Sequence, residues 1–307
     1  MAKRDFLTLL DCSSDELSAL VARGRELKQN LAQRDHRPLL GHTAVLILAL
    51  NSTRTRVAFE TGMNQLGGHT IVLNPEDTQL GRGEPIEDMA RVLSEMVDVI
   101  IIRTLEQTDI QRFAGTASVP VINAMSAKYH PCQLLADVQT FEELRGPVAG
   151  RTVAFVGDGH NMCHSYINAA RRWGFNLKIA CPEGYSPDAA VLDSTNHASL
   201  VESAREAVEG ADLVVTDVWS SMGQEEEAAR RREQFAPFQV NEALLDHAPD
   251  HTVFMHCLPA HRGEEISETL LDDPRSAVWQ EAGNRLHSQK ALLEFLLLED
   301  FPAGPSA

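Results

Sequence analysis

The chain lacks the features of secreted, membrane-bound and nucleic-acid-binding proteins. It has only 5 cysteines, an odd number without a Cys-X-X-Cys pair, which argues against a disulfide framework or a zinc ribbon and fits a reducing cytosol. Its 27 basic residues stand against 44 acidic ones, and a net charge of −17 disfavours nucleic-acid binding. No apolar run is long enough to cross a bilayer, and the one near the N-terminus is too short for a signal peptide. We therefore expect a cytoplasmic protein with no membrane or nucleic-acid partner.

What the sequence does have is a repeated alternation of apolar strands with segments of helical spacing. Such alternation predicts an α/β fold with parallel sheets, whose ligands gather at the carboxyl ends of the strands. The stretch 145–150, which contains Gly146, Pro147 and Gly150, is the best candidate boundary, because the pattern restarts after it. The length of 307 residues allows two domains of this kind. The strands are predicted at 45–50, 70–73, 99–102 and 120–123, then at 152–156, 177–180, 213–216 and 252–255.

The first predicted strand runs into Ser52-Thr53-Arg54-Thr55-Arg56, at the start of a predicted helix. The first N–H groups of a helix have no partners inside it and lie at the positive end of its dipole, so they attract anions. Arg54 can grip a phosphate in a forked geometry, whereas Arg56 points to another side of the helix and is expected to have a structural partner. The alternative is an ordinary capped helix with solvated arginines.

Other polar residues at predicted strand ends have ordinary structural interpretations when each is taken alone. His130 could cap a helix, Cys257 could be a small buried apolar residue, and Asp217 could cap the serines that follow it. Together they suggest more. One half of the chain offers cationic and donor groups suited to an anion and a carbonyl oxygen, and the other offers groups suited to a zwitterionic amine.

Gly157-Asp158-Gly159 follows a predicted strand and raises the alternative of a nicotinamide site. The third glycine of that fingerprint is missing, because position 162 is Met, and no acidic residue ends the next strand. A nucleotide-binding oxidoreductase is therefore the third choice.

Five strings in order resemble the signature set of the ornithine carbamoyltransferase family. They are Ser52 to Arg56, Asp77 to Glu84, His130 to Gln133, Asp217 to Gln224 and His256 to Pro259, and the agreement in spacing extends from about residue 5 to residue 298. The resemblance implies two domains, each a parallel β-sheet flanked by helices, with the active site in the cleft between them. It implies a carbamoyl phosphate-binding domain at 1–145, completed by a C-terminal helix at 286–307, and an ornithine-binding domain at 150–285.

The resemblance also implies roles for individual residues. The catalytic set would be Arg54, Arg103, His130, Asp217 and Cys257. Carbamoyl phosphate would be held by Ser52, Thr53, Arg54, Thr55, Gln79, Arg103, His130, Gln133, Cys257, Leu258 and Arg285, with Gln79 reaching a neighbouring subunit of a trimer. Ornithine would be held by Asn161, Asp217, Ser221 and the Met222 backbone. No metal or organic cofactor is implied.

The function implied is transfer of a carbamoyl group to the side-chain amine of L-ornithine, giving L-citrulline and phosphate in arginine biosynthesis. Two alternatives stay open: a carbamoyltransferase for another amine, such as putrescine or an N-acylated ornithine, and an inactive homologue that binds carbamoyl phosphate. Some residues depart from the family's usual pattern, namely Leu48, Ala49 and Leu50 before the Ser-Thr-Arg string, His160 before Asn161, and Gly283 before Asn284.

Overall fold

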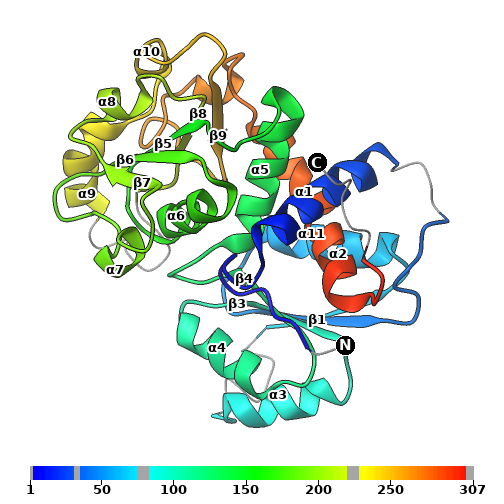
Figure 1. Cartoon of the computed structure of the whole chain (residues 1–307). Helices are drawn as coiled ribbons and strands as arrows, with labels where there is room; N and C mark the ends of the chain where they lie inside the picture. The colour runs from blue at the N-terminus through cyan, green and yellow to red at the C-terminus, as the bar shows by residue number, and fades with distance from the viewer. Residues whose placement is uncertain (1–2, 31–34, 75–82, 220–227, 302–307) are drawn as a thin grey trace. The chain divides into compact units, whose positions relative to one another are not determined.

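The computed structural model describes residues 3–30, 35–74, 83–219 and 228–301 (Figure 1). The chain divides into two compact units. The first unit comprises Met1–Gln139 and Gly283–Ala307, and the second comprises Thr140–Ala282. Each unit contains one parallel sheet flanked by helices, which confirms the fold class expected from the sequence.

The first unit is built on a four-stranded sheet with the strand order β2-β1-β3-β4. Its strands are β1 (Thr43–Leu48), β2 (His69–Leu73), β3 (Val99–Arg103) and β4 (Val121–Met125). Its helices are α1 (Ser14–Gln29), α2 (Thr53–Gln65), α3 (Ile86–Ser94), α4 (Gln107–Thr116) and the first part of α5 (Pro131–Arg145), together with most of α11 (Val278–Leu297). Helices α3 and α4 cover one face of this sheet, while α1, α2 and α11 lie on the other (Figure 1).

The order of these strands reverses between β1 and β3, which are neighbours in the sheet. Leu48 at the end of β1 pairs with Arg103 at the end of β3. Residues that follow the two strands therefore emerge side by side, at the point where open parallel sheets bind their ligands. This topology brings Ser52 and Arg103 to the same edge.

The second unit is built on a five-stranded sheet with the strand order β7-β6-β5-β8-β9. Its strands are β5 (Thr152–Val156), β6 (Asn176–Ala180), β7 (Ala198–Leu200), β8 (Leu213–Thr216) and β9 (Val253–His256). Its helices are α6 (Asn161–Trp173), α7 (Ala189–Leu192), α8 (Ala204–Val208), α9 (Ala228–Phe235) and α10 (Glu242–Leu245), with the short 3-10 helices η4 (Ala236–Phe238) and η5 (Leu270–Asp272). Here the strand order reverses between β5 and β8.

Successive side chains of a strand point to opposite faces of the sheet, and helices cover these faces. In β1, Val45 and Ile47 belong to the apolar cluster that includes Met89 of α3 and Phe113 of α4. Strands that are buried on both faces read as continuous apolar runs rather than as alternating ones. This is why the strands that form continuous apolar runs could be predicted from composition.

Capping side chains and a glycine in the left-handed conformation mark the ends of several helices. Ser13 and Glu16 form the predicted capping box at the start of α1. The Ser52 side chain caps α2 by accepting a hydrogen bond from the Thr55 N–H. Gly174 ends α6 with φ 70°, a left-handed conformation that glycine adopts without steric cost.

Two local expectations were wrong. The helical spacing of Val57, Met63 and Leu66 predicts that they share an apolar face of α2. Val57 is instead 54% exposed, because that helix buries Thr55, Ala58, Phe59, Gly62 and Met63. The last helix was expected to begin at residue 286 and begins eight residues earlier, at Val278. The sequence before Leu286 is polar and contains Gly283, so it carries little of the apolar pattern that marks a helix.

Candidate active site

The turn at Ser52, proposed as an anion site from the sequence, lies at the start of α2 as expected. Ser52 accepts a hydrogen bond from the Thr55 N–H at 3.2 Å and donates one to the Thr55 hydroxyl at 3.1 Å. Thr55 is fully buried, while Thr53 is exposed and Arg54 is half-buried. Arg56 pairs with Glu60, four residues later on the same exposed helix face, at 3.3 Å. The turn thus separates Arg54 from Arg56, as expected from their spacing.

A buried histidine lies among three arginines at this edge of the first sheet. His130 precedes α5 and is 5% exposed. Burial lowers the pKa of His130 well below its usual value of 6.5, and the positive charges of Arg285, Arg103 and Arg54 lower it further. Three guanidinium groups around one neutral imidazole form a strongly cationic site, which suits a compact dianion.

Gln133 links this site to the C-terminal helix. It lies in the first turn of α5 and is 1% exposed. Its Oε1 accepts a hydrogen bond from the Arg285 guanidinium at 2.6 Å, and its Nε2 donates to Asp137 at 2.8 Å. The contact fixes Arg285 of α11 beside the start of α5, although the two residues are 152 positions apart.

The second unit presents an acidic group and a thiol at the ends of adjacent strands. Thr216 of β8 pairs with His256 of β9, so Asp217 and Cys257 follow side by side. The Cys257 thiol donates a hydrogen bond to Asp217 Oδ1 at 3.2 Å, and the Val218 N–H donates to the same oxygen at 2.8 Å. Burial raises the pKa of Asp217, and the opposing effects of His256, of the Val218 N–H and of the Cys257 thiol are smaller. A carboxylate with a raised pKa is a stronger base than an exposed one.

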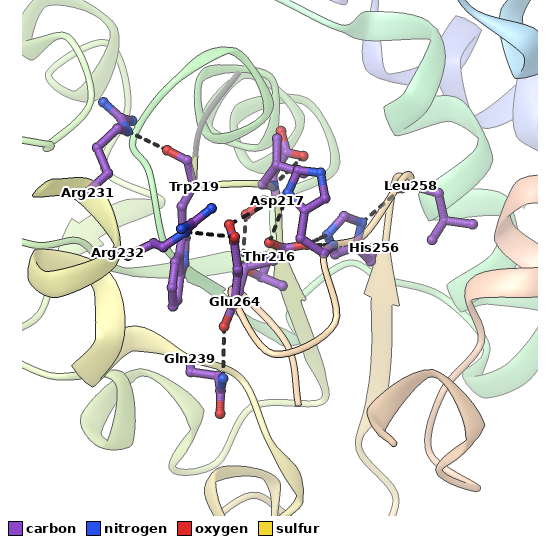
Figure 2. A network of polar contacts seen from close by, with 12 residues as sticks. Thr216, Asp217, Trp219, Arg231, Arg232, Gln239, His256, Leu258 and Glu264 are labelled. Atoms are coloured by element: carbon purple, nitrogen blue, oxygen red, sulfur yellow. Dashed lines mark hydrogen bonds and ion pairs between the residues drawn. The ribbon is translucent and has the colours of Figure 1, made fainter. Parts of the chain in front are cut away.

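Leu258, next to Cys257, has an unusual backbone conformation. Its φ is 56°, a left-handed value that costs a leucine about 1–2 kcal/mol. The Leu258 N–H donates to Nδ1 of His256 at 2.9 Å, and Figure 2 shows this contact at the end of β9. The conformation turns the chain sharply away from the strand directly after the thiol.

Asn161 starts α6, just after the Gly157-Asp158-Gly159 turn. Its Oδ1 accepts a hydrogen bond from the Met162 N–H at 2.8 Å, and the residue is 7% exposed. The two glycines of the turn have local structural causes. Gly157 has φ 132°, and a Cβ on Gly159 would lie 2.3 Å from the Pro187 nitrogen. Close backbone packing thus explains the glycines without a dinucleotide.

Arg231 of α9 anchors a polar network beside Asp217. Its guanidinium donates to the carbonyl of Trp219, which follows the end of β8 (Figure 2). The guanidinium also donates to the Asp158 carboxylate. The same guanidinium lies over the rings of Tyr185 and Phe235. The ion pair is nearly fully buried, so it ties α9 to the turn after β5 and to the chain after β8.

Among the residues that the structure describes, two groups of side chains could offer metal ligands: Asp217, His256 and Cys257, and His261, Glu264 and Glu265. Within each group the candidate ligand atoms lie within 4.8 Å of one another. In the first group the His256 ring is engaged at both nitrogens, by the Leu258 N–H and by Glu265, and the thiol is bonded to Asp217. In the structure, the candidate ligand atoms of the first group are therefore used in a hydrogen-bonded network.

Three of the predicted site residues, Gln79, Ser221 and Met222, lie outside the described residues. The rest fall into two groups, one in each unit. The groups are Ser52, Thr53, Arg54, Thr55, Arg103, His130, Gln133 and Arg285 in the first unit, and Asn161, Asp217, Cys257 and Leu258 in the second. Their catalytic and binding roles stay predictions.

Sequence reasoning missed Glu265 and assigned no role to His256. His256 belongs to a string that the sequence analysis quoted, so the string itself was the available signal. Glu265 lies in a polar loop whose pattern gives no sign that its side chain is fully buried. A buried carboxylate of this kind becomes visible only once the loop is folded.

Comparison with known proteins identifies relatives of the chain over almost its whole length. The model of the carbamoyl-P binding domain of aspartate/ornithine carbamoyltransferase matches residues 4–143, and the model of its Asp/Orn binding domain matches residues 149–296. Ornithine carbamoyltransferase of Chromohalobacter salexigens is 58% identical over 301 residues, which are 97% of this chain and 99% of that protein. The anabolic ornithine carbamoyltransferase of Pseudomonas aeruginosa is 57% identical over 300 residues, which are 97% of this chain and 98% of that protein. The ornithine carbamoyltransferase structure from Pyrococcus furiosus superposes with a TM-score of 0.92 at 45% identity, covering 97% of this chain and 98% of that one.

Proposed function

Since the chain belongs to the aspartate/ornithine carbamoyltransferase family, we propose that it transfers the carbamoyl group of carbamoyl phosphate to the side-chain amine of L-ornithine. The products are L-citrulline and phosphate. The observation that carries the proposal is the group of half-buried Arg54 and buried Arg103 and Arg285, whose charges all act on a buried, neutral His130 in an otherwise acidic protein.

In the first unit, this cluster binds carbamoyl phosphate. Ser52, Thr53 and Thr55, at the start of α2, hold the phosphate together with Arg54. Arg103, His130 and Gln133 hold the carbonyl end, and Arg285 adds a positive charge that Gln133 keeps in place. As the tetrahedral intermediate forms, negative charge grows on the carbonyl oxygen and then on the departing phosphate. Fixed donors aimed at that charge stabilise it.

His130 acts as a neutral hydrogen-bonding group. Its lowered pKa keeps the imidazole uncharged at neutral pH, so it polarises the carbonyl oxygen without supplying a full positive charge. The positive charge comes from the three arginines, whose guanidinium groups stay protonated throughout the reaction.

In the second unit, Asn161 and Asp217 bind the α-amino and carboxylate ends of ornithine, together with Ser221 and the Met222 backbone. Cys257 and Leu258 line the reacting centre. The amine nitrogen attacks the carbonyl carbon, the bond from that carbon to the phosphate oxygen breaks, and a second proton of the nitrogen passes to the departing phosphate. The nucleophile must first lose a proton, because an ammonium group has no free electron pair.

Cys257 and Asp217 take that proton. The thiol already donates to Asp217 at 3.2 Å, so Sγ accepts a proton from the ammonium group as its own proton moves to the carboxylate. Burial raises the pKa of Asp217 and makes this acceptor more basic. The proton returns to solvent after citrulline and phosphate leave.

We further propose a homotrimer in which Gln79 completes the site of a neighbouring subunit, and a role in arginine biosynthesis in the cytoplasm. The biosynthetic role is supported by the anabolic relative of Pseudomonas aeruginosa. The location is supported by five free cysteines, which fit a reducing compartment. Among the described helices, none is long and apolar enough to cross a membrane.

The test is carbamoyl transfer by the purified protein, with ornithine, putrescine, N-acetylornithine and aspartate supplied in parallel. Phosphate release and the ureido product are both followed. We expect turnover with ornithine alone. Preference for another amine would overturn the substrate assignment, and no turnover with any amine would favour a carbamoyl phosphate-binding homologue.

Two arginine variants make the assay specific to the site. Arg54→Ala is expected to lower kcat by roughly 100-fold or more, because it removes a donor aimed at the developing charge. Arg56→Ala, two residues away and paired with Glu60 on the exposed face, is the matched control and should keep nearly full activity. Equal losses in both variants would contradict the assignment of Arg54 to the phosphate.

A further inference from the structure

A fully buried carboxylate lies behind the loop that carries Cys257 and Leu258. Glu265 is 0% exposed. Its Oε1 accepts a hydrogen bond from the His261 N–H at 2.6 Å and lies 3.2 Å from Nε2 of His256. Its Oε2 lies 3.9 Å from Nδ1 of His261. A carboxylate in the interior is costly unless polar partners satisfy it, so its contacts show that it holds His256 and His261 in place.

The ring of His256 is fixed at both of its nitrogens. The Leu258 N–H donates to Nδ1 at 2.9 Å, and a ring nitrogen that accepts a hydrogen bond carries no proton. The proton of the neutral ring is therefore on Nε2, where it points to Glu265. The carboxylate thus selects the tautomer that can accept from Leu258.

Leu258 depends on this contact. Its φ of 56° is rare for a residue with a branched side chain, and such a conformation persists only where the surroundings hold it. Its own N–H is the atom that His256 holds. Cys257, bonded to Asp217, comes immediately before it in the chain.

We propose that Glu265 and His256 position the Cys257–Leu258 segment for carbamoyl transfer. Glu265 fixes the tautomer of His256, and His256 fixes the backbone of Leu258, which sets the direction of the adjacent thiol. Both side chains are 0% exposed, so they act through the loop rather than on the substrates. The inference rests on the proposed function, which puts Cys257 and Leu258 at the reacting centre.

Two substitutions of His256 separate its two contacts. In His256→Asn, the amide oxygen can take the place of Nδ1 and accept from the Leu258 N–H. In His256→Gln, the longer amide reaches the place of Nε2 and keeps the contact with Glu265, but it leaves Leu258 without its acceptor. Both variants remove the ring, so loss of packing affects them alike. His247→Gln, at an exposed histidine of the same unit, is the control for histidine loss itself.

We expect His256→Gln to lower kcat by roughly 100-fold with little change in KM for ornithine, because misplacing reacting groups by about 1 Å has an effect of this size. His256→Asn should lose tenfold or less. Glu265→Gln, which keeps an oxygen for His256, should likewise lose far less than Glu265→Met. Equal losses in the Asn and Gln variants of His256, or losses confined to KM, would overturn the proposal.

A measurement on the unaltered protein tests the hydrogen-bond chain independently of activity. Nitrogen NMR of labelled histidine, with His256→Asn used to assign the signal, reports which ring nitrogen carries the proton. We expect protonated Nε2 and unprotonated Nδ1, and the reverse would overturn the proposal. If the unaltered protein does not carbamoylate ornithine, the proposed function fails, and the tautomer still shows whether this chain of contacts exists.

Discussion

His130 is the residue whose surroundings say most about the chemistry of the first unit. Three arginines near a buried imidazole make protonation of that ring unfavourable in the folded protein. The protonation of His130 is therefore coupled to binding of the anion that these arginines are proposed to hold. A change in pH acts on both the site and the stability of the unit that contains it.

The stability of the protein should fall with acidification in a way that depends on His130. Its folded pKa lies below the usual 6.5, so between those two values the unfolded chain binds a proton that the folded chain does not. The free energy of unfolding therefore falls as pH drops below about 6.5, by up to about 1.4 kcal/mol per pH unit. Urea titrations at pH 7, 6 and 5 should show a smaller loss for His130→Asn than for the unaltered protein. A loss of equal size, or one that His247→Gln reduces as much, would show that His130 is not the cause.

Asp217→Asn should weaken the reaction of ornithine while leaving carbamoyl phosphate binding intact. Asp217 belongs to the second unit, whereas the cationic cluster belongs to the first. Loss of a charged hydrogen-bonding partner is worth about 1.5–3 kcal/mol, so kcat/KM for ornithine should fall roughly 10- to 150-fold. Steady-state kinetics with varied ornithine measure the loss, and calorimetry without ornithine measures carbamoyl phosphate binding. Asp250→Asn, at an exposed aspartate of the same unit, is the matched control. A large loss of carbamoyl phosphate affinity in Asp217→Asn would contradict this division of roles.

At the scale of elements, α11 contains an opportunity for stabilisation. Gly283 lies inside this helix and is exposed, and a Cβ added there would meet nothing within 4 Å. Glycine in a helix interior is less favourable than alanine by about 1 kcal/mol. Gly283→Ala should therefore raise the free energy of unfolding by about 0.5–1 kcal/mol.

The matched control is Gly174→Ala at the end of α6, where open space surrounds the Cβ position but φ is 70°. This substitution should destabilise by about 1–2 kcal/mol, because alanine is strained in the left-handed region. Urea or thermal unfolding of both variants provides the measurement. If both variants shift stability in the same direction, backbone conformation is not what decides the effect.

Elements with a strong local pattern could be predicted from the sequence. The strands at 152–156 and 213–216 lie where the apolar runs placed them. The three-residue strand β7 was missed, because it is a partly exposed strand at the sheet edge and carries no apolar run. The action of Arg54 and Arg103 on His130 fits the rule that the carboxyl ends of parallel strands share an edge. The pairing of Thr216 with His256 could not be predicted from the sequence, because the register of two strands depends on which strands are neighbours in the sheet and not on either strand alone.

At the scale of the whole molecule, charge is distributed unevenly. The chain carries a net charge of −17, while its candidate anion site has three arginines whose charges act on the buried His130. An excess of negative charge keeps proteins apart and soluble but does not attract an anionic substrate over distance. Capture of carbamoyl phosphate must therefore depend on the local cluster, and an additional donor from a second copy of the chain would strengthen it.

Mixing two inactive variants tests whether the site is shared between subunits. Arg54→Ala removes the phosphate ligand of a subunit, and Gln79→Ala removes the group proposed to reach its neighbour. In a mixed trimer, a site that takes Arg54 from one subunit and Gln79 from the next is complete. Dissociating both variants together and reassociating them at equal concentration should restore up to about a quarter of the wild-type rate, because random assembly pairs intact partners at that frequency. The two variants reassociated separately provide the baseline, and sedimentation checks that trimers form. Trimers that stay as inactive as the separate variants would place Gln79 and Arg54 in the same subunit's site, and a monomeric protein would remove the shared site altogether.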